Sequence, residues 1–229
     1  HQKKNFDGHR ELLLEYEVEL QLLREVTSRF VQLREHALYH ETYILPLLKK
    51  VYNFSGKLRS QIEKNSVITI VNSKAVALYK NKTLSLPVGS KKNIIIPRQI
   101  LRNECFQKSC LKGIIDTDFT MTQDAQLVGN LASLSLLKQM SCLLKNLKIE
   151  HKLHLQEFGG RLTIYKRCAT QIFEEWQLNN QKHTSKYTIL NETGKYIPFT
   201  TTLERLAFLK GEIDLEMLMV ISNQRRENT

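Results

Sequence analysis

The sequence is poor in glycine and proline and has no long apolar run. Its 229 residues include nine Gly and four Pro, too few to form a long flexible linker. No apolar stretch approaches the ~20 residues that a membrane-spanning helix needs, and the first residues show no signal-peptide pattern. We therefore expect an intracellular, cytoplasmic chain with no membrane partner and enough core for one large or two small domains.

Cysteine is also scarce. The four cysteines (Cys105, Cys110, Cys142 and Cys168) form no C-x-x-C pair and have no nearby histidine at the spacing of metal ligands. This pattern argues against a zinc site and a disulfide framework. It predicts reduced, mostly buried thiols, as in intracellular proteins.

Acidic residues are nearly absent from one long segment. Residues 49–112 contain fourteen Lys and Arg against two acids, Glu63 and Glu104, a net charge of +12. The whole chain carries +11, so the remainder is close to neutral, with 20 basic and 21 acidic residues. Such a concentration of positive charge favours a polyanionic partner, most often nucleic acid. A solvated face and an anionic membrane surface are the weaker alternatives, because no basic amphipathic helix with an aromatic face is present.

Hydrophobic periodicity predicts an α+β protein with antiparallel strands. Residues 14–22 alternate apolar and polar side chains as a half-buried strand does, with 27–34 as its hairpin partner, although the Glu-rich composition favours a helix. A helix is predicted over 36–52, with Pro46 as a kink or a late start. The later expected elements are strands at 57–64, 66–72, 118–124, 126–132, 150–157 and 161–166, and helices at 73–81, from about 98, ending at Asp118, at 134–147 and at 168–176.

The stretch LKGIIDTD, residues 111–118, carries the main chemical signal. Leu111, Ile114 and Ile115 are spaced to line one helical face, and Gly113 among them would let another backbone come close. The helix is expected to end near Asp118, where strand-like alternation begins. A carboxylate there is a candidate metal ligand, and the alternative is a helix cap or a solvated turn residue.

The order of elements repeats along the chain. Each half reads strand, strand, helix, strand, strand, helix, and Ile-Thr-Ile at 68–70 has a counterpart in Leu-Thr-Ile at 162–164. A repeat of this kind suggests a pseudo-dyad, which suits a pseudo-symmetric ligand such as duplex DNA. We expect two halves, residues 1–97 and 98–190, followed by a helical tail at 198–229. Thr201 and Glu204 fit a capping box in the tail, which is either the start of a helix-turn-helix or a helical pair packed on the core.

The sequence LKGIIDTDF resembles the LAGLIDADG motif, and an ordered set of further segments is similar to the same family. These segments are residues 86–92, 96–97, 133–137, 143–149, 161–164, 173–176, 180–183 and 185–187. The resemblance covers roughly residues 14–190 and is greatest to the two-motif, single-chain homing endonucleases of archaeal type.

The resemblance implies two αββαββα halves whose motif helices pack together and whose antiparallel sheets form a saddle on double-stranded DNA. It also implies hydrolysis of phosphodiester bonds in both strands with a divalent metal, usually Mg²⁺, by a monomer that uses no small-molecule cofactor. Asp118 matches the metal-binding catalytic carboxylate, and Lys166 matches a catalytic basic residue near the scissile phosphate, unless it only anchors phosphate or is solvated. The basic residues expected to contact DNA are Lys74, Lys91, Lys92, Arg161, Lys166, Arg167, Lys182 and Lys186.

Two departures from the family pattern affect these expectations. Phe119 stands where the family usually has Gly, and the first motif is missing or degenerate. Asp7, in Phe-Asp-Gly-His at residues 6–9, is the candidate for the second metal-binding and catalytic carboxylate; the alternative is a frayed terminus. The alternative functions are therefore a DNA-binding regulator of this fold without nuclease activity and an RNA-binding cofactor of intron splicing.

Overall fold

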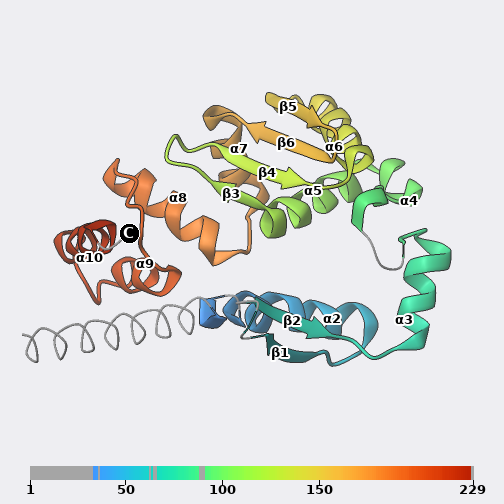
Figure 1. Cartoon of the computed structure of the whole chain (residues 1–229), viewed down its shortest axis with the longest axis horizontal. Coiled ribbons are helices and arrows are strands. Elements are labelled where there is room, and N and C mark those ends of the chain that lie inside the picture. Colours follow the sequence, from blue (N-terminus) through green and yellow to red (C-terminus); the bar gives the residue numbers. More distant parts are fainter. Residues whose placement is uncertain (1–32, 36, 62, 64–65, 88–90, 228–229) are drawn as a thin grey trace, which may run out of the picture. The chain divides into compact units, whose positions relative to one another are not determined.

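The computed structural model describes residues 33–227 except 36, 62, 64–65 and 88–90. The chain divides into two compact units, residues 1–71 and 72–229, which are described separately. Figure 1 shows the elements of each unit. The predicted strand at 14–22 lies outside the described residues.

The first unit begins with helical residues. Residues 33–35 and 37–39 are helical, so the predicted strand at 27–34 is wrong for its last two residues; Leu33 is buried, and Ala37 follows at helical spacing. A π-helix η1 (His40–Ile44) then leads into α2 (Leu45–Tyr52), which confirms the helix predicted here. Pro46 lies in the first turn of α2, where a missing N–H is tolerated.

A hairpin packs on α2 within this unit. Strands β1 (Lys57–Gln61) and β2 (Ser66–Ile70) pair antiparallel, shorter than predicted. A Cβ at Gly56 would lie 2.8 Å from the Thr69 side chain and 3.0 Å from that of Leu45, so this close approach requires glycine.

The second unit opens with short helices that lead to the motif helix. The residues before the motif form α3 (Lys74–Leu78), the π-helix η3 (Tyr79–Thr83), the 3₁₀-helix η4 (Lys91–Asn93) and α4 (Arg98–Leu101). Asn103 interrupts the helical run, because its extended backbone and its side chain, which accepts from the Phe106 N–H at 3.2 Å, cap a new helix. That helix, α5 (Glu104–Asp118), ends at Asp118 as predicted.

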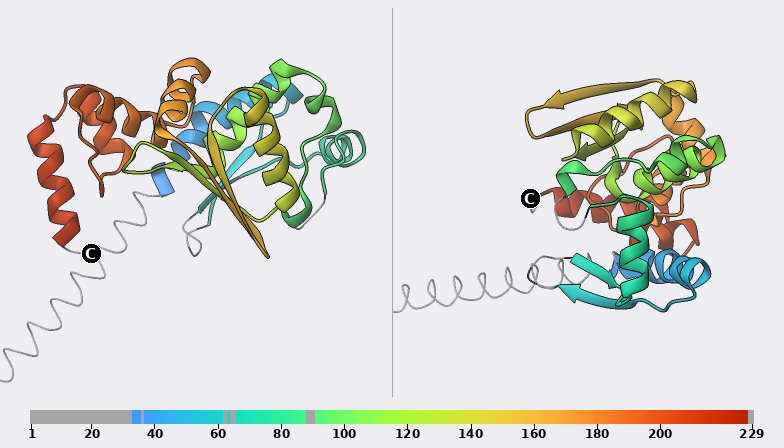
Figure 2. Two further views of the ribbon diagram at one scale, coloured as in Figure 1. Left: turned by 90° about the horizontal axis from the view of Figure 1, so that it is seen from above. Right: turned by 90° about the vertical axis from the view of Figure 1, so that its right-hand side faces the viewer.

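A four-stranded antiparallel sheet follows. It contains β3 (Phe119–Met121), β4 (Leu127–Leu131), β5 (His151–Gln156) and β6 (Gly159–Ile164), in the order β3-β4-β6-β5. The strands are visibly twisted in the side views (Figure 2). The antiparallel sheets of residues 57–70 and 119–164, together with the helices, confirm the predicted α+β class.

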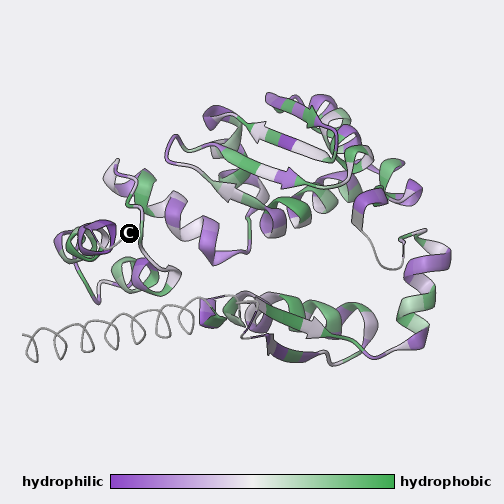
Figure 3. Cartoon of the chain, in the orientation of Figure 1, coloured by the Kyte–Doolittle hydropathy of each residue, from purple (hydrophilic) through white to green (hydrophobic). Residues whose placement is uncertain are grey.

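Helices cover one face of this sheet. Besides α5, α6 (Leu134–Asn146) contacts the strands, and α7 (Lys166–Trp176) follows β6. The largest buried core joins residues of α5, α6 and α7, including Trp176, with Phe119, Met121, Leu127, Leu162 and Ile164 of the sheet. Figure 3 shows the resulting alternation of apolar and polar residues along the strands.

The chain ends in three helices: α8 (Gln181–Thr193), α9 (Thr202–Leu209) and α10 (Leu215–Glu227). They have a small core of their own around Ile189, Ile197 and Leu218. The predicted capping box of Thr201 and Glu204 is confirmed. The domain borders and the helix-turn-helix stay predictions. None of the helices described is long and apolar enough to cross a bilayer.

The carboxylate of Glu204 joins the capping box to α10. Arg225 donates to it through both guanidinium ends, at 2.7 Å from Nη1. Burial opposes ionisation, but the hydrogen bonds from Arg225 and Thr201 outweigh it and hold the pKa of Glu204 below its ordinary 4.5.

We expect Glu204→Gln to lower the free energy of unfolding by about 1–2 kcal/mol near neutral pH, because it removes a charge-assisted bidentate pair. The lowered pKa means that this stabilisation is present above pH 4.5 and is lost as pH falls through the folded-state pKa. Urea unfolding of both proteins across acidic pH measures this. If the two proteins differ in free energy of unfolding at about pH 3 as much as at neutral pH, the stabilisation does not come from the ionised Glu204 carboxylate.

Candidate functional site

The end of α5 presents one carboxylate to solvent. Leu111 and Ile115 are buried, which fixes the apolar side of the helix as predicted, and Ile114 is half-buried. Asp118, the last residue of α5, is exposed, and the Thr117 hydroxyl donates to its Oδ2 at 2.8 Å. The described residues contain no backbone approach to Gly113, where an added Cβ would have no neighbour within 4 Å.

The position of Asp118 is electrostatically unfavourable without a cation. The C-terminal end of a helix carries partial negative charge, and an acid there costs about 0.3–1 kcal/mol. A divalent cation would relieve this repulsion, and carboxylate oxygens suit Mg²⁺. Among the described residues no cluster of three or more His, Cys, Asp or Glu surrounds a possible metal position. Asp7 lies outside the described residues.

Asp116 plays a different part from Asp118. It is 1% exposed, and its carboxylate accepts the N–H groups of Asn179 and Asn180 at 2.9–3.1 Å. These bonds occupy the oxygens that a metal would need. Sequence reasoning did not single out Asp116, although its spacing from Asp118 is a signal: residues i and i+2 of a helix face different sides.

The side of the four-stranded sheet that faces away from α5 and α6 is mostly polar. Val128 also lies on this side and is buried, at 4% exposure. Alternation and register place six polar side chains on it: Thr120, Asn130, Lys152, His154, Arg161 and Thr163. We call these six residues the polar sheet face. Asn130, Arg161 and His154 pair in one row across β4, β6 and β5. None of the six is acidic, and the described part of the chain offers no ion-pair partner to Lys152 or Arg161.

The predicted DNA-contacting residues are spread over several elements. Arg161 is on the polar sheet face, whereas the others lie on helices: Lys74 on α3, Lys91 and Lys92 on η4, Lys166 and Arg167 on α7, and Lys182 and Lys186 on α8. The ammonium of Lys186 lies 6.0 Å from the Tyr196 ring centroid, a cation–π distance.

Lys166 needs a correction. It was expected at the end of a strand, but β6 ends at Ile164 and Lys166 is the first residue of α7. The helix begins this early because Tyr165, in extended conformation, serves as its N-cap residue. Lys166 and Arg167 are both exposed.

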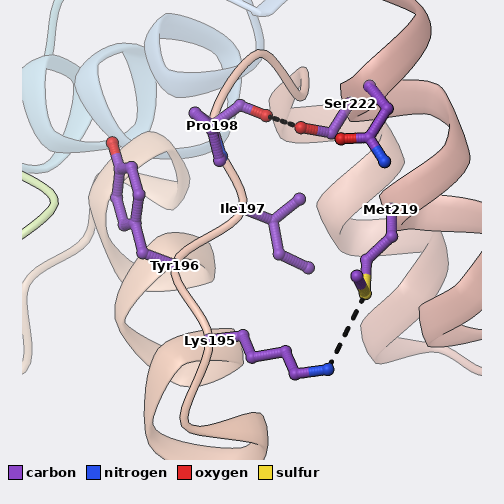
Figure 4. Close-up of a pocket in the computed structure, with 7 residues that line it drawn as sticks. Lys195, Tyr196, Ile197, Pro198, Met219 and Ser222 are labelled. Atoms are coloured by element: carbon purple, nitrogen blue, oxygen red, sulfur yellow. Dashed lines mark hydrogen bonds between the residues drawn. The ribbon is translucent and has the colours of Figure 1, made fainter.

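A cavity of about 300 Å³ lies in the C-terminal helices (Figure 4). Lys195, Tyr196, Ile197, Pro198, Met219, Ser222 and Asn223 line it. Ser222 donates to the Pro198 carbonyl at 2.6 Å, and the Lys195 ammonium lies 4.0 Å from the Met219 sulfur. The cavity contains none of the site residues expected from the sequence.

His183 on α8 is a buried histidine that stays neutral. Its side chain is 2% exposed, and burial lowers its pKa to about 3, helped by the positive charges of Lys182, Lys186 and Arg205 and opposed by a hydrogen bond with the Asp116 backbone. Its Nδ1 is buried and without a hydrogen-bond partner in the described structure. It is therefore not suited to acid–base catalysis near neutral pH.

We expect His183 to make the protein less stable in acid. Between pH 6.5 and about 3 the unfolded chain binds a proton here that the folded chain does not, so the free energy of unfolding falls with pH by up to about 1.4 kcal/mol per unit. In urea unfolding, the free energy of unfolding of His183→Gln should fall less steeply than that of the unchanged chain between about pH 6.5 and 4.5. Parallel pH profiles for the two proteins would refute this.

Comparison with known proteins finds likeness in structure but not in sequence. No family model matches the sequence, and no curated protein matches it. The fold is similar to a chain in "The crystal structure of I-DmoI in complex with DNA and Mn", with a TM-score of 0.44 and 20% identity, over 62% of this chain and 75% of that one. A likeness this weak carries no argument about function.

Proposed function

We propose that the chain is a double-stranded DNA endonuclease of the LAGLIDADG type that uses Mg²⁺ bound at Asp118. The observation that carries this proposal is the polar sheet face, whose six residues are exposed or half-buried and include no acid, together with an exposed carboxylate directly before its edge strand β3. The net charge of +11 supports a polyanionic partner.

The polar sheet face has the side chains that read DNA. A β-ribbon fits the major groove, where Asn130 can pair with adenine and Arg161 with guanine, and threonine hydroxyls accept or donate. Lys152 and the exposed lysines of the neighbouring helices would contact phosphates, which position the duplex without reading its sequence.

The proposed chemistry divides among three residues. Asp118, with Asp7 as the second carboxylate, would hold the metal. Mg²⁺ supplies an activated water and stabilises the leaving oxygen of a phosphodiester. Lys166 would stabilise charge that develops on the scissile phosphate.

A DNA-binding protein without nuclease activity is the second candidate. It is favoured by the single exposed carboxylate at the end of α5, since the described residues contain no metal cluster. Both candidates predict salt-dependent DNA binding, and only the first predicts cleavage. A preference for intron RNA over duplex DNA would instead favour the splicing cofactor.

We expect the double variant Lys152→Ala/Arg161→Ala to weaken duplex binding and to lower the salt slope of log K by about 2, because two phosphate or base contacts are lost. Fluorescence anisotropy at several salt concentrations measures this. Lys138→Ala/Lys145→Ala is the matched control, since both lysines are exposed on α6, which covers the opposite sheet face. If the two double variants weaken duplex binding equally, the polar sheet face is not the surface that binds DNA.

We expect Asp118→Asn to abolish Mg²⁺-dependent cleavage of a randomised duplex library while DNA binding is kept. Without divalent metal the same variant should be more stable by about 0.3–1 kcal/mol, since it removes an acid from a helix C-terminus. Library sequencing and urea unfolding test the two halves. If Asp118→Asn yields as much cut product as the unchanged chain, Asp118 has no role in cleavage. If the unchanged chain binds DNA without cutting it, the second candidate is established.

A further inference from the structure

Two carboxylates close the motif, and their surroundings differ sharply. Asp118 is exposed, whereas Asp116 is almost completely buried. In the described structure no cation forms a salt bridge with Asp116. A buried carboxylate is costly unless hydrogen bonds replace its water, so the partners of Asp116 indicate what it is for.

All side-chain partners of Asp116 lie in the junction before α8. The Asn179 N–H donates to Oδ1 and Oδ2 at 3.1 and 2.9 Å, and the Asn180 N–H donates to Oδ1 at 3.0 Å. The positive end of the α8 dipole also faces this carboxylate, which lowers the cost of its burial.

Asn180 bonds in the opposite direction as well. Its Nδ2 donates to the Asp116 carbonyl at 2.6 Å, and its Oδ1 accepts the Lys182 N–H at 3.0 Å. One side chain therefore satisfies a carbonyl in the last turn of α5 and an N–H in the first turn of α8. The ends of the two helices are joined by reciprocal hydrogen bonds.

We propose that Asp116 is a positioning residue for the metal site, and that Asn180 completes the same junction. The junction holds the last turn of α5, so it fixes the direction in which Asp118 projects two residues later. It also makes α8 part of the site's support, and with it the small core that α8 shares with α9 and α10. This inference rests on the proposed function, because it assumes that Asp118 binds a divalent metal.

Manganese binding tests this without requiring cleavage. Free Mn²⁺ is measured by electron paramagnetic resonance during titration of the 229-residue chain and its variants, and thermal unfolding is measured without metal. Asp116→Asn keeps the shape of the side chain but replaces one acceptor oxygen with a donor that faces N–H groups. Asn180→Ala removes the reciprocal bonds and leaves Asp116 intact, so two independent variants probe the junction. Glu204→Gln is the stability control, because it weakens the contact between α9 and α10 away from α5.

Both junction variants should weaken Mn²⁺ binding at least about tenfold, as expected for groups that orient a metal ligand. Glu204→Gln should lower the melting temperature comparably yet keep Mn²⁺ affinity within about twofold. Unchanged affinity in both junction variants, or an equal loss in the control, would overturn the positioning role alone. If Asp118→Ala binds Mn²⁺ as tightly as the unchanged chain, this inference and the proposed metal site are both overturned.

Discussion

The hydrogen bonds between Asp116 and residues 179–180 join the last turn of the motif helix to the start of α8. Asp116 closes the motif helix, and Asn180 opens the C-terminal helices. Because the carboxylate is buried, these bonds form in a low-dielectric environment where a missing partner is expensive. The junction therefore adopts a single arrangement, and this arrangement fixes the positions of the end of α5 and the start of α8.

The sheet owes its polar face to alternation along β3 and β6 and over the first residues of β5. Leu162 and Ile164 point into the core, and Arg161 and Thr163 point away from it. The register of β4, β6 and β5 then aligns the outward positions into rows. A one-residue slip of β6 would bury Arg161 and expose Leu162, so packing energy maintains the chemical identity of the face.

Charge is distributed in a way that packing does not require. Asp118 lies where the helix dipole disfavours an acid, while the neighbouring sheet face carries donors and no acids. Such a combination is poor for stability and suits a cation and a polyanion that arrive together. Strain of this kind is typical of functional positions, where the local rules of folding are broken.

The sequence by itself determined the end of the motif helix and most of the described elements after residue 36, whereas the strand predicted at 27–34 was wrong at residues 33–34. Apolar spacing, the alternation after Asp118 and the pairing of Thr201 with Glu204 are local, so they are visible in a short window of residues. Its basic bias also indicated a polyanionic partner. Prediction failed where a boundary depended on one residue, as at Lys166, where Tyr165 begins α7 immediately after β6.

Only the tertiary structure decided which motif carboxylate is available for a metal. The partners of Asp116 lie 63 and 64 residues away, and no local pattern specifies a pairing of that range. The burial of His183 and the exposure of Arg161 and Lys152 on the polar sheet face depend in the same way on which elements pack together. Periodicity tells which side of an element is apolar, but the contacts between elements determine which polar groups remain in water.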